Sequence, residues 1–169
     1  MSENEIMKLM DTINYGWIDK NGIKHIDDFK TFSDDYILQS PEELINNKIG
    51  ICWDQVELER ECFKNYKSLK TFFLVHYDND ICPTHTFLTY EKDNKYYWFE
   101  HSWKKFKGIH EYNSLNDLLI NVKQYFVEFE LKNNYDENNL IMRKYTKPKY
   151  NITAQGFFKH CGKGEVIKI

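Results

Sequence analysis

Three consecutive β-prone segments occupy the middle of the chain and restrict the folds open to it. They cover residues 70–77, 84–91 and 95–103, and each is rich in aromatic and β-branched side chains. Only residues 92–94 separate the second segment from the third, so these two strands are expected to pair antiparallel. Helical patterns precede and follow this run instead of alternating with the strands. The order therefore predicts an α+β fold rather than a parallel sheet.

Signals for helix starts and for a tight turn lie on either side of these strands. Ser40 can cap a helix that begins at Pro41, and Glu43 completes a capping box. An Asn-Gly pair within residues 15–26 joins two short runs and predicts a hairpin. The apolar spacing predicts helices over residues 4–13, 41–47, 52–66 and 115–129, and an ordered loop or short helix is expected over 27–38.

The length of 169 residues is enough for one domain with its own hydrophobic core. Residues 17–130 hold most of the regular patterns and are expected to form this core. Residues 132–169 are polar and irregular apart from two short apolar runs, and we expect them to pack on the core as a C-terminal tail. The chain is thus expected to be a single domain over residues 1–169.

Charge and hydropathy argue against two classes of partner. A net charge of −3 gives no indication of a nucleic-acid partner, and no apolar run approaches the about 20 residues that a membrane span needs. The first ten residues mix Glu and Lys with apolar side chains and contain no signal-peptide core. A cytoplasmic location is therefore expected, with the four cysteines as reduced thiols.

Cys52 lies where a loop should turn into a helix. Gly50, two residues earlier, can adopt backbone angles closed to other residues and so suits a sharp turn. In helical projection one side carries Cys52, Val56, Cys62, Phe63 and Tyr66, and the other carries Asp54, Glu57, Glu61, Lys64 and Asn65. Cys52 is therefore expected in the first turn on the buried face, where unpaired N–H groups and the helix dipole favour a thiolate. The alternative is a small apolar residue packed at a helix start.

A nucleophilic cysteine needs a base, and the base needs a partner that orients it. His85 begins the second strand and Glu100 lies near the end of the third, so antiparallel pairing brings the two close together. A carboxylate there would hold one tautomer of the imidazole and stabilise the imidazolium. The competing base is His101, but its side chain points to the opposite face of the strand from Glu100 and has no evident acid of its own.

Three motifs carry these residues: Gly50-Ile51-Cys52-Trp53-Asp54, Thr84-His85-Thr86-Phe87 and Tyr97-Trp98-Phe99-Glu100-His101-Ser102-Trp103. Together they resemble the transglutaminase-like core of the papain-like cysteine enzymes. In that family a Gly-x-Cys sequence opens the central helix, a histidine begins a strand, and an acid ends the next strand. The family acid is usually Asp, and Glu100 takes that place here. The resemblance implies a cysteine-bearing helix packed on an antiparallel sheet.

The resemblance also implies a function, namely acyl transfer or amide hydrolysis through a thioester at Cys52. His85 would be the general base and then the acid, and Glu100 would orient it. Substrates would be peptide or protein amides, such as a peptide bond, a glutamine carboxamide or a peptide cross-link. No cofactor is implied, and no acidic loop resembles a calcium site. The Cys52 N–H would serve an oxyanion hole, to which some members add a tryptophan indole, here Trp17, while Trp53 would form a cleft wall.

Three other interpretations concern the same residues. A chain of this kind can be a non-catalytic module that keeps the cleft to bind a peptide or a protein. Cys82 and His85, in a Cys-x-x-His sequence, could share a zinc ion with His160 and Cys161, although no second close pair has the usual spacing. Glu59 falls inside the apolar face of the cysteine-bearing helix, which predicts an ion pair with an Arg or Lys.

Overall fold

The computed structural model describes residues 1–79 and 82–169 and has a six-stranded sheet at its centre. The strands follow the order β6-β5-β4-β3-β7-β8, and each pair of neighbours runs antiparallel. Their bounds are β3 Lys67–His76, β4 Thr84–Lys92, β5 Lys95–Glu100, β6 Gly108–Tyr112, β7 Leu140–Tyr145 and β8 Glu165–Ile167. A separate hairpin pairs β1 (Trp17–Ile18) with β2 (Lys24–His25). The fold is α+β, as predicted.

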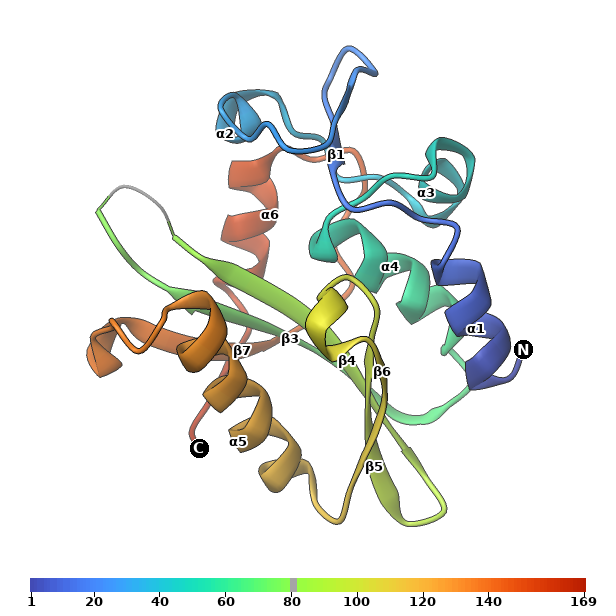
Figure 1. Ribbon diagram of the computed structural model, residues 1–169, viewed down its shortest axis with the longest axis vertical. Helices are drawn as coiled ribbons and strands as arrows, with labels where there is room; N and C mark the ends of the chain where they lie inside the picture. Colours follow the sequence, from blue (N-terminus) through green and yellow to red (C-terminus); the bar gives the residue numbers. More distant parts are fainter. Residues whose placement is uncertain (80–81) are drawn as a thin grey trace.

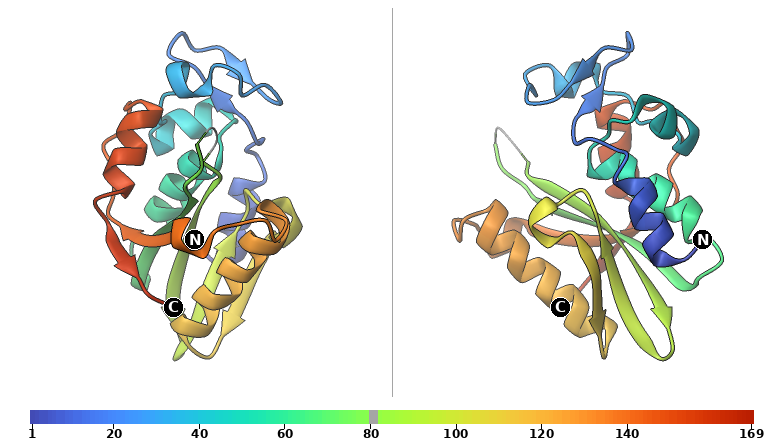
Figure 2. Two further views of the ribbon diagram at one scale, coloured as in Figure 1. Left: turned by 90° about the vertical axis from the view of Figure 1, so that its left-hand side faces the viewer. Right: turned by 45° about the vertical axis from the view of Figure 1, so that its right-hand side comes forward.

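Helices cover both faces of this sheet (Figure 1; Figure 2). They are α1 Glu3–Met10, α2 Phe32–Asp35, α3 Pro41–Asn47, α4 Cys52–Cys62, α5 Leu115–Tyr125 and α6 Ala154–Cys161. Helix α5 lies on one face, whereas α4 lies on the other with α1, α3 and α6 around it. Short helical turns at Lys104–Phe106, Phe126–Glu130 and Glu137–Asn139 complete the described elements.

Alternation along β3 accounts for a sheet that is apolar on both faces. Phe72 and Leu74 pack with the apolar side chains of α5, and Phe73 and Val75 pack on the other face with the start of α4. Successive side chains of a strand point to opposite faces, so a continuous apolar run places apolar groups on both. The central strand therefore holds α4 and α5 on opposite sides of the molecule.

Helix α4 is buried around its whole circumference over its first two turns. Every residue from Cys52 to Glu59 is at most 5% exposed, and these residues include Asp54 and Glu57. Helical projection put Asp54 and Glu57 opposite the buried face, yet both are buried, because Asp54 bonds to Tyr36 and Gln39 and Glu57 pairs with Arg60. The helix also ends at Cys62 rather than at Tyr66.

Local turn and capping predictions are confirmed. Ser40 Oγ accepts the Glu43 N–H at 3.2 Å and Glu43 Oε2 accepts the Ser40 N–H at 2.8 Å, so α3 begins with a capping box. Strands β1 and β2 pair antiparallel, with Gly22 at a φ of 80° between them. Asp93 and Asn94 join β4 to β5 with positive φ at both residues, which suits a two-residue hairpin.

The C-terminal segment belongs to the core and is not a tail packed on it. Strand β7 pairs with residues 71–76 of β3 inside the sheet, and α6 buries Phe157 and Cys161 completely. Helix α1 likewise has its apolar side buried against α4. The expected core limits of 17–130 are therefore too narrow. Arg143-Lys144 interrupts the alternation in β7, and this hid the strand in the sequence.

Gly50 is required for space and not for an unusual backbone conformation. It has no positive φ, so the prediction that it supplies special backbone angles is wrong. A Cβ at this position would lie 2.5 Å from Leu44 Cδ1 and 2.9 Å from Asp54 Cβ. The left-handed residue before α4 is Lys48, which has a φ of 56° and ends α3. Helices α3 and α4 approach each other too closely at Gly50 for a side chain.

Candidate functional site

The paired part of strands β4 and β5 ends just before the candidate base and acid. The last register pair at this end is Leu88 with Phe99, and both Glu100 and His85 lie beyond it. His85 Nε2 is 2.8 Å from Glu100 Oε2, and both side chains are buried. The structure therefore brings the predicted base and acid together, although they are not partners within the ladder.

The Glu100 carboxylate is held on both of its oxygens. Oε2 accepts a hydrogen bond from Trp98 Nε1 at 3.1 Å, besides its contact with His85. Oε1 accepts from Ser102 Oγ at 3.1 Å and from the Trp103 N–H at 2.9 Å. These contacts fix the carboxylate in one orientation and aim Oε2 at the imidazole. The additional methylene of Glu, relative to Asp, does not prevent that contact.

The Cys52 thiol lies close enough to the His85 ring to affect its pKa. Since Nε2 contacts Glu100, Nδ1 is the ring nitrogen left for the sulfur. Burial by itself lowers the pKa of His85, but the charge of Glu100, the nearby Cys52 thiol and the hydrogen bond to Glu100 outweigh it and raise this pKa to about 10. The His85 ring therefore stays protonated at neutral pH.

Asp54 fixes the helix start that carries the thiol. Cys52 is the first residue of α4, so its backbone N–H has no acceptor within the helix. Asp54 Oδ2 accepts the Ile51 N–H at 3.0 Å. Its Oδ1 accepts the Tyr36 hydroxyl at 2.9 Å and the Gln39 N–H at 3.0 Å. One buried carboxylate thus ties the loop before α3 to the first turn of α4.

We expect Asp54→Asn to lower the free energy of unfolding by about 1–3 kcal/mol in urea denaturation at pH 8. All three partners of the carboxylate are donors, namely the Ile51 N–H, the Tyr36 hydroxyl and the Gln39 N–H. In either orientation the NH₂ group of Asn would face a buried donor and leave it without an acceptor. Burial raises the pKa of Asp54 to about 7, against the lowering by these hydrogen bonds, so the carboxylate is ionised at pH 8. The control Asp34→Asn, exposed on α2, should stay within about 0.5 kcal/mol of wild type. Equal unfolding midpoints for the Asp54 variant and wild type would contradict the role.

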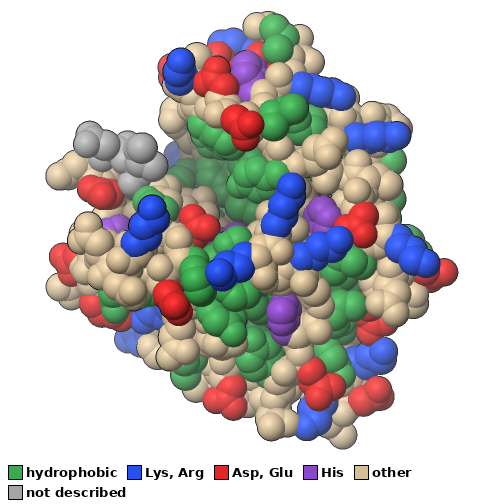
Figure 3. Space-filling view, viewed as in Figure 1, with side chains coloured by type: hydrophobic (Ala, Val, Ile, Leu, Met, Phe, Trp, Pro, Cys, Tyr) green, Lys and Arg blue, Asp and Glu red, His purple; other side chains and the backbone are tan. Residues whose placement is uncertain are grey.

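A cavity of about 510 Å³ opens beside Cys52. Its aromatic lining consists of Tyr15, Phe29, Phe32, Trp53 and Phe158. The indole N–H of Trp53 donates to Thr84 Oγ1 at 3.1 Å, and the Trp53 ring stacks on Phe157 with centroids 4.4 Å apart. Figure 3 shows apolar side chains around a hollow below the lobe formed by β1 and α2. Trp53 lies in a wall of the cavity, where the resemblance had placed it.

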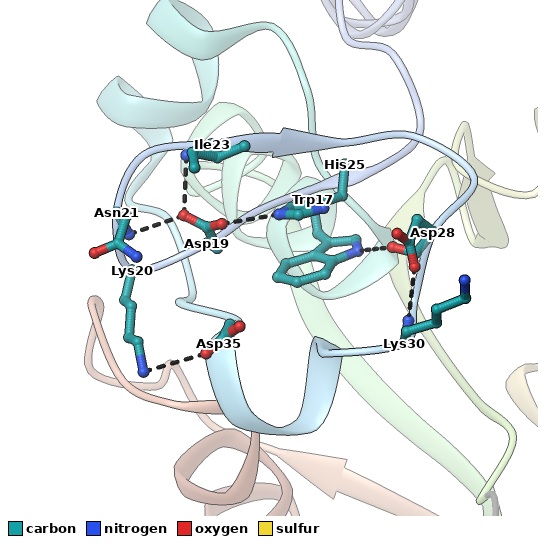
Figure 4. Close-up of polar contacts among 9 residues, drawn as sticks. All are labelled: Trp17, Asp19, Lys20, Asn21, Ile23, His25, Asp28, Lys30 and Asp35. Carbon is teal, nitrogen blue, oxygen red and sulfur yellow. Dashed lines mark hydrogen bonds and ion pairs between the residues drawn. The ribbon is translucent and has the colours of Figure 1, made fainter.

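Trp17 is buried behind this cavity, but its N–H is directed elsewhere. Its Nε1 donates to the backbone carbonyl of Asp28 at 2.8 Å (Figure 4). The ring stacks on His25 with centroids 4.1 Å apart, and His25 contacts Asp19 Oδ2 at 2.8 Å. Trp17 therefore does not offer its indole to an oxyanion in this arrangement, contrary to the expected role. Its edge contact with Phe32, at 5.4 Å, supports the cavity wall instead.

Tyr15 was not expected in the site. It lines the cavity beside Cys52 and also a second cavity of about 520 Å³. Phe29 and Phe32 come from the loop and short helix after the hairpin, and they were not assigned to the site either. The available signal was the density of aromatic residues over 27–38, but nothing in the local pattern says which way those rings point.

His101 has both ring nitrogens occupied away from the cysteine. Nδ1 lies 2.7 Å from Gln55 Oε1, and Nε2 lies 3.1 Å from Asp11 Oδ1. The expectation that His101 has no acid is therefore wrong, since Asp11 at the end of α1 provides one. These contacts join α1, α4 and β5 and leave no ring nitrogen for a substrate or for Cys52.

Glu59 has no ion-pair partner among the described residues. The acid that pairs with a basic residue is instead Glu57, two residues earlier, whose Oε1 contacts Arg60 Nε at 2.8 Å. Burial raises the pKa of Glu59 well above its usual range, and the charge of Glu100 adds to the rise. The carboxyl group that contacts His85 is that of Glu100 and not that of Glu59.

The residues considered as zinc ligands have other partners. His85 contacts Glu100, and His160 Nε2 contacts the Thr146 carbonyl at 2.8 Å. Across residues 1–79 and 82–169, no group of three or more His, Cys, Asp or Glu side chains is arranged to hold a metal ion. All four cysteines are free thiols.

The helices and the comparisons with family models and curated proteins do not identify the chain further. In the part of the chain that the structure describes, each helix is too short or too polar to traverse a lipid bilayer. No family model matches the sequence, and no curated protein matches it either. Its function is therefore inferred from its own residues and their geometry.

Proposed function

We propose that this protein is a cysteine-dependent enzyme that transfers or hydrolyses acyl groups through a thioester at Cys52. The observation that supports this most strongly is the buried 2.8 Å contact between His85 Nε2 and Glu100 Oε2, with the Cys52 thiol close enough to the same ring to affect its pKa. A nucleophile, a base bonded to it and a group that orients the base are the parts that nucleophilic catalysis requires.

The proposal includes a papain-like core of the transglutaminase type. In support, the helix that begins at Cys52 packs on an antiparallel sheet, and His85 and Glu100 follow on the neighbouring strands β4 and β5. This is the order of elements that the three sequence motifs imply. The substrate class is accordingly a peptide or protein amide.

The reaction proceeds in two half-reactions. The Cys52 thiolate attacks the acyl carbon, and the C–N bond breaks as the His85 imidazolium gives its proton to the leaving amine. The products of this half are an acyl thioester and a free amine. Water or an acceptor amine then attacks the thioester while His85 takes its proton, and the thiolate leaves. Water yields a carboxylic acid, and an amine yields a new amide. The Cys52 N–H is suited to stabilise the oxyanion.

The test is to trap the thioester. Reaction with p-nitrophenyl acetate should release p-nitrophenolate, and peptide mapping after acid quench should find the acetyl group on Cys52. Cys82→Ala removes the other cysteine that lines the cavity and should leave this labelling unchanged, whereas Cys52→Ala should abolish it. Labelling at Cys82 instead, or none in folded protein, would refute the proposal. A non-catalytic binding module would hold an amide in the cavity without becoming acylated.

A further inference from the structure

The cavity beside Cys52 is aromatic and uncharged. Five aromatic side chains line its volume of about 510 Å³, and no charged side chain is among the lining residues that the structure describes. Pockets that hold small organic ligands have volumes of about 300–1,000 Å³. The cavity is therefore large enough for a substrate side chain, and its walls favour an apolar one.

Two polar groups of this lining are already used within the wall. Thr84 Oγ1 accepts the Trp53 indole N–H, and Gln155 Nε2 donates to the Ser33 carbonyl. A carboxamide that enters this cavity exchanges its water contacts for the few polar groups that remain, and an ammonium group loses more. The cavity thus disfavours a glutamine or lysine side chain.

The aromatic wall is held in place by rings behind it. Trp53 meets Phe32 edge-on at 5.4 Å and stacks on Phe157. Phe29 lies 5.8 Å from Phe32, which is itself supported by Trp17. Edge and offset contacts are the arrangements that aromatic pairs prefer. A planar ring that enters the cavity therefore contacts aromatic faces and edges that are already fixed by their neighbours.

The polar part of a substrate fits a second cavity. It has about 520 Å³, shares Tyr15 with the first, and is lined by Asp27, Ser102 and Lys104. Ser102 also donates to Glu100 Oε1, so this cavity is lined by a residue that holds the acid of the site. Both cavities are lined by Tyr15, and only the second has charged side chains among its lining residues that the structure describes.

We infer that the acyl part of the substrate carries an aromatic side chain, which occupies the cavity beside Cys52. This inference rests on the proposed function and names its substrate class. It selects an amide with an aromatic acyl residue over a glutamine carboxamide.

The experiment compares four N-acetylated amino-acid chloromethyl ketones with the side chains of Phe, Leu, Gln and Lys. Each alkylates Cys52 by displacement of chloride, and iodoacetamide serves as a reference electrophile that needs no pocket. The Phe reagent should inactivate Cys52 about 10- to 100-fold faster than the Gln or Lys reagent, with Leu between them. Equal rates for the four reagents would overturn the inference.

Phe29→Ala tests whether the cavity is the source of the preference. Phe29 is 45% exposed, so its truncation should leave the fold intact while removing one wall. The preference for Phe over Gln should fall at least about threefold, with the iodoacetamide rate unchanged. The matched control is Tyr135→Ala, which truncates an aromatic residue that is 40% exposed and lies outside this cavity. A preference that survives Phe29→Ala but changes in the control would place the subsite elsewhere.

Binding to Cys52→Ala separates this inference from the proposed function. N-acetylphenylalanine amide should quench the Trp fluorescence of that variant at lower concentration than N-acetylglutamine amide, because Trp53 lines the cavity. If this binding preference is found but Cys52 of the wild type does not react, the aromatic subsite is retained and the proposed enzyme activity is refuted. A reactive Cys52 without any side-chain preference would retain the enzyme and refute the subsite.

Discussion

His85→Ala is expected to slow the acylation of Cys52 at pH 7 by about 10²- to 10⁴-fold, the usual contribution of a positioned general base. The variant loses the imidazolium next to the thiol and leaves Glu100 without its partner at 2.8 Å. Acylation is measured as the initial release of p-nitrophenolate from p-nitrophenyl acetate. Far-ultraviolet circular dichroism and a urea unfolding curve establish that the variant is folded.

The matched control is His101→Ala, which removes the competing histidine. His101 spans Gln55 and Asp11, so its loss is expected to change the acylation rate less than threefold while it lowers stability by about 1 kcal/mol. If His101→Ala strongly slowed acylation while His85→Ala changed it less than threefold, His101 would be the base. If folded His85→Ala protein reacted as fast as wild type, His85 would not be the base, and a binding function would be favoured.

The elements that the sequence predicted well are those specified by local chemistry. Ser40 and Glu43 form their capping box whatever surrounds them, and the Asp93-Asn94 turn fixes the β4–β5 hairpin. The elements that were missed depend on distant partners. Strand β7 shows Arg143 and Lys144 in sequence, and only the pairing with β3 makes it part of the sheet. Local patterns cannot reveal a strand whose stability comes from a partner far along the chain.

The predictions for the candidate site also divide into those that local sequence specifies and those that depend on long-range packing. The meeting of His85 and Glu100 followed from the order of two adjacent strands joined by a short turn. The burial of Asp54 did not follow from helical projection, which treats a helix as having one solvent side. The position of Tyr15 depends on how the hairpin folds over α4, and that long-range packing has no local signature in the sequence.

Glu100→Gln is expected to slow acylation at pH 7 by about 10- to 100-fold, an effect between those of wild type and His85→Ala. Gln keeps a hydrogen-bonding oxygen for His85 but loses the negative charge. That charge is the main cause that raises the pKa of His85, while burial lowers it. In the variant the imidazole is therefore neutral at pH 7, and the thiol reacts as an ordinary cysteine. Its alkylation by iodoacetamide should increase up to about pH 8.5, where an unperturbed thiol ionises, whereas wild type should already react at pH 6.

The same substitution changes how stability depends on pH. The folded state raises the pKa of His85 to about 10, above the about 6.5 of an unfolded chain. The pair's contribution is therefore complete below about pH 6.5 and is lost as the pH rises through about 10, because the folded state binds the proton more tightly. Over this interval wild type should lose roughly 3–5 kcal/mol more than Glu100→Gln. Urea unfolding at pH 6, 8 and 10 measures the difference, with the exposed Glu111→Gln as the control that follows wild type. Parallel stability curves for wild type and Glu100→Gln would mean that Glu100 does not hold the proton on His85, and the positioning role would be lost with it.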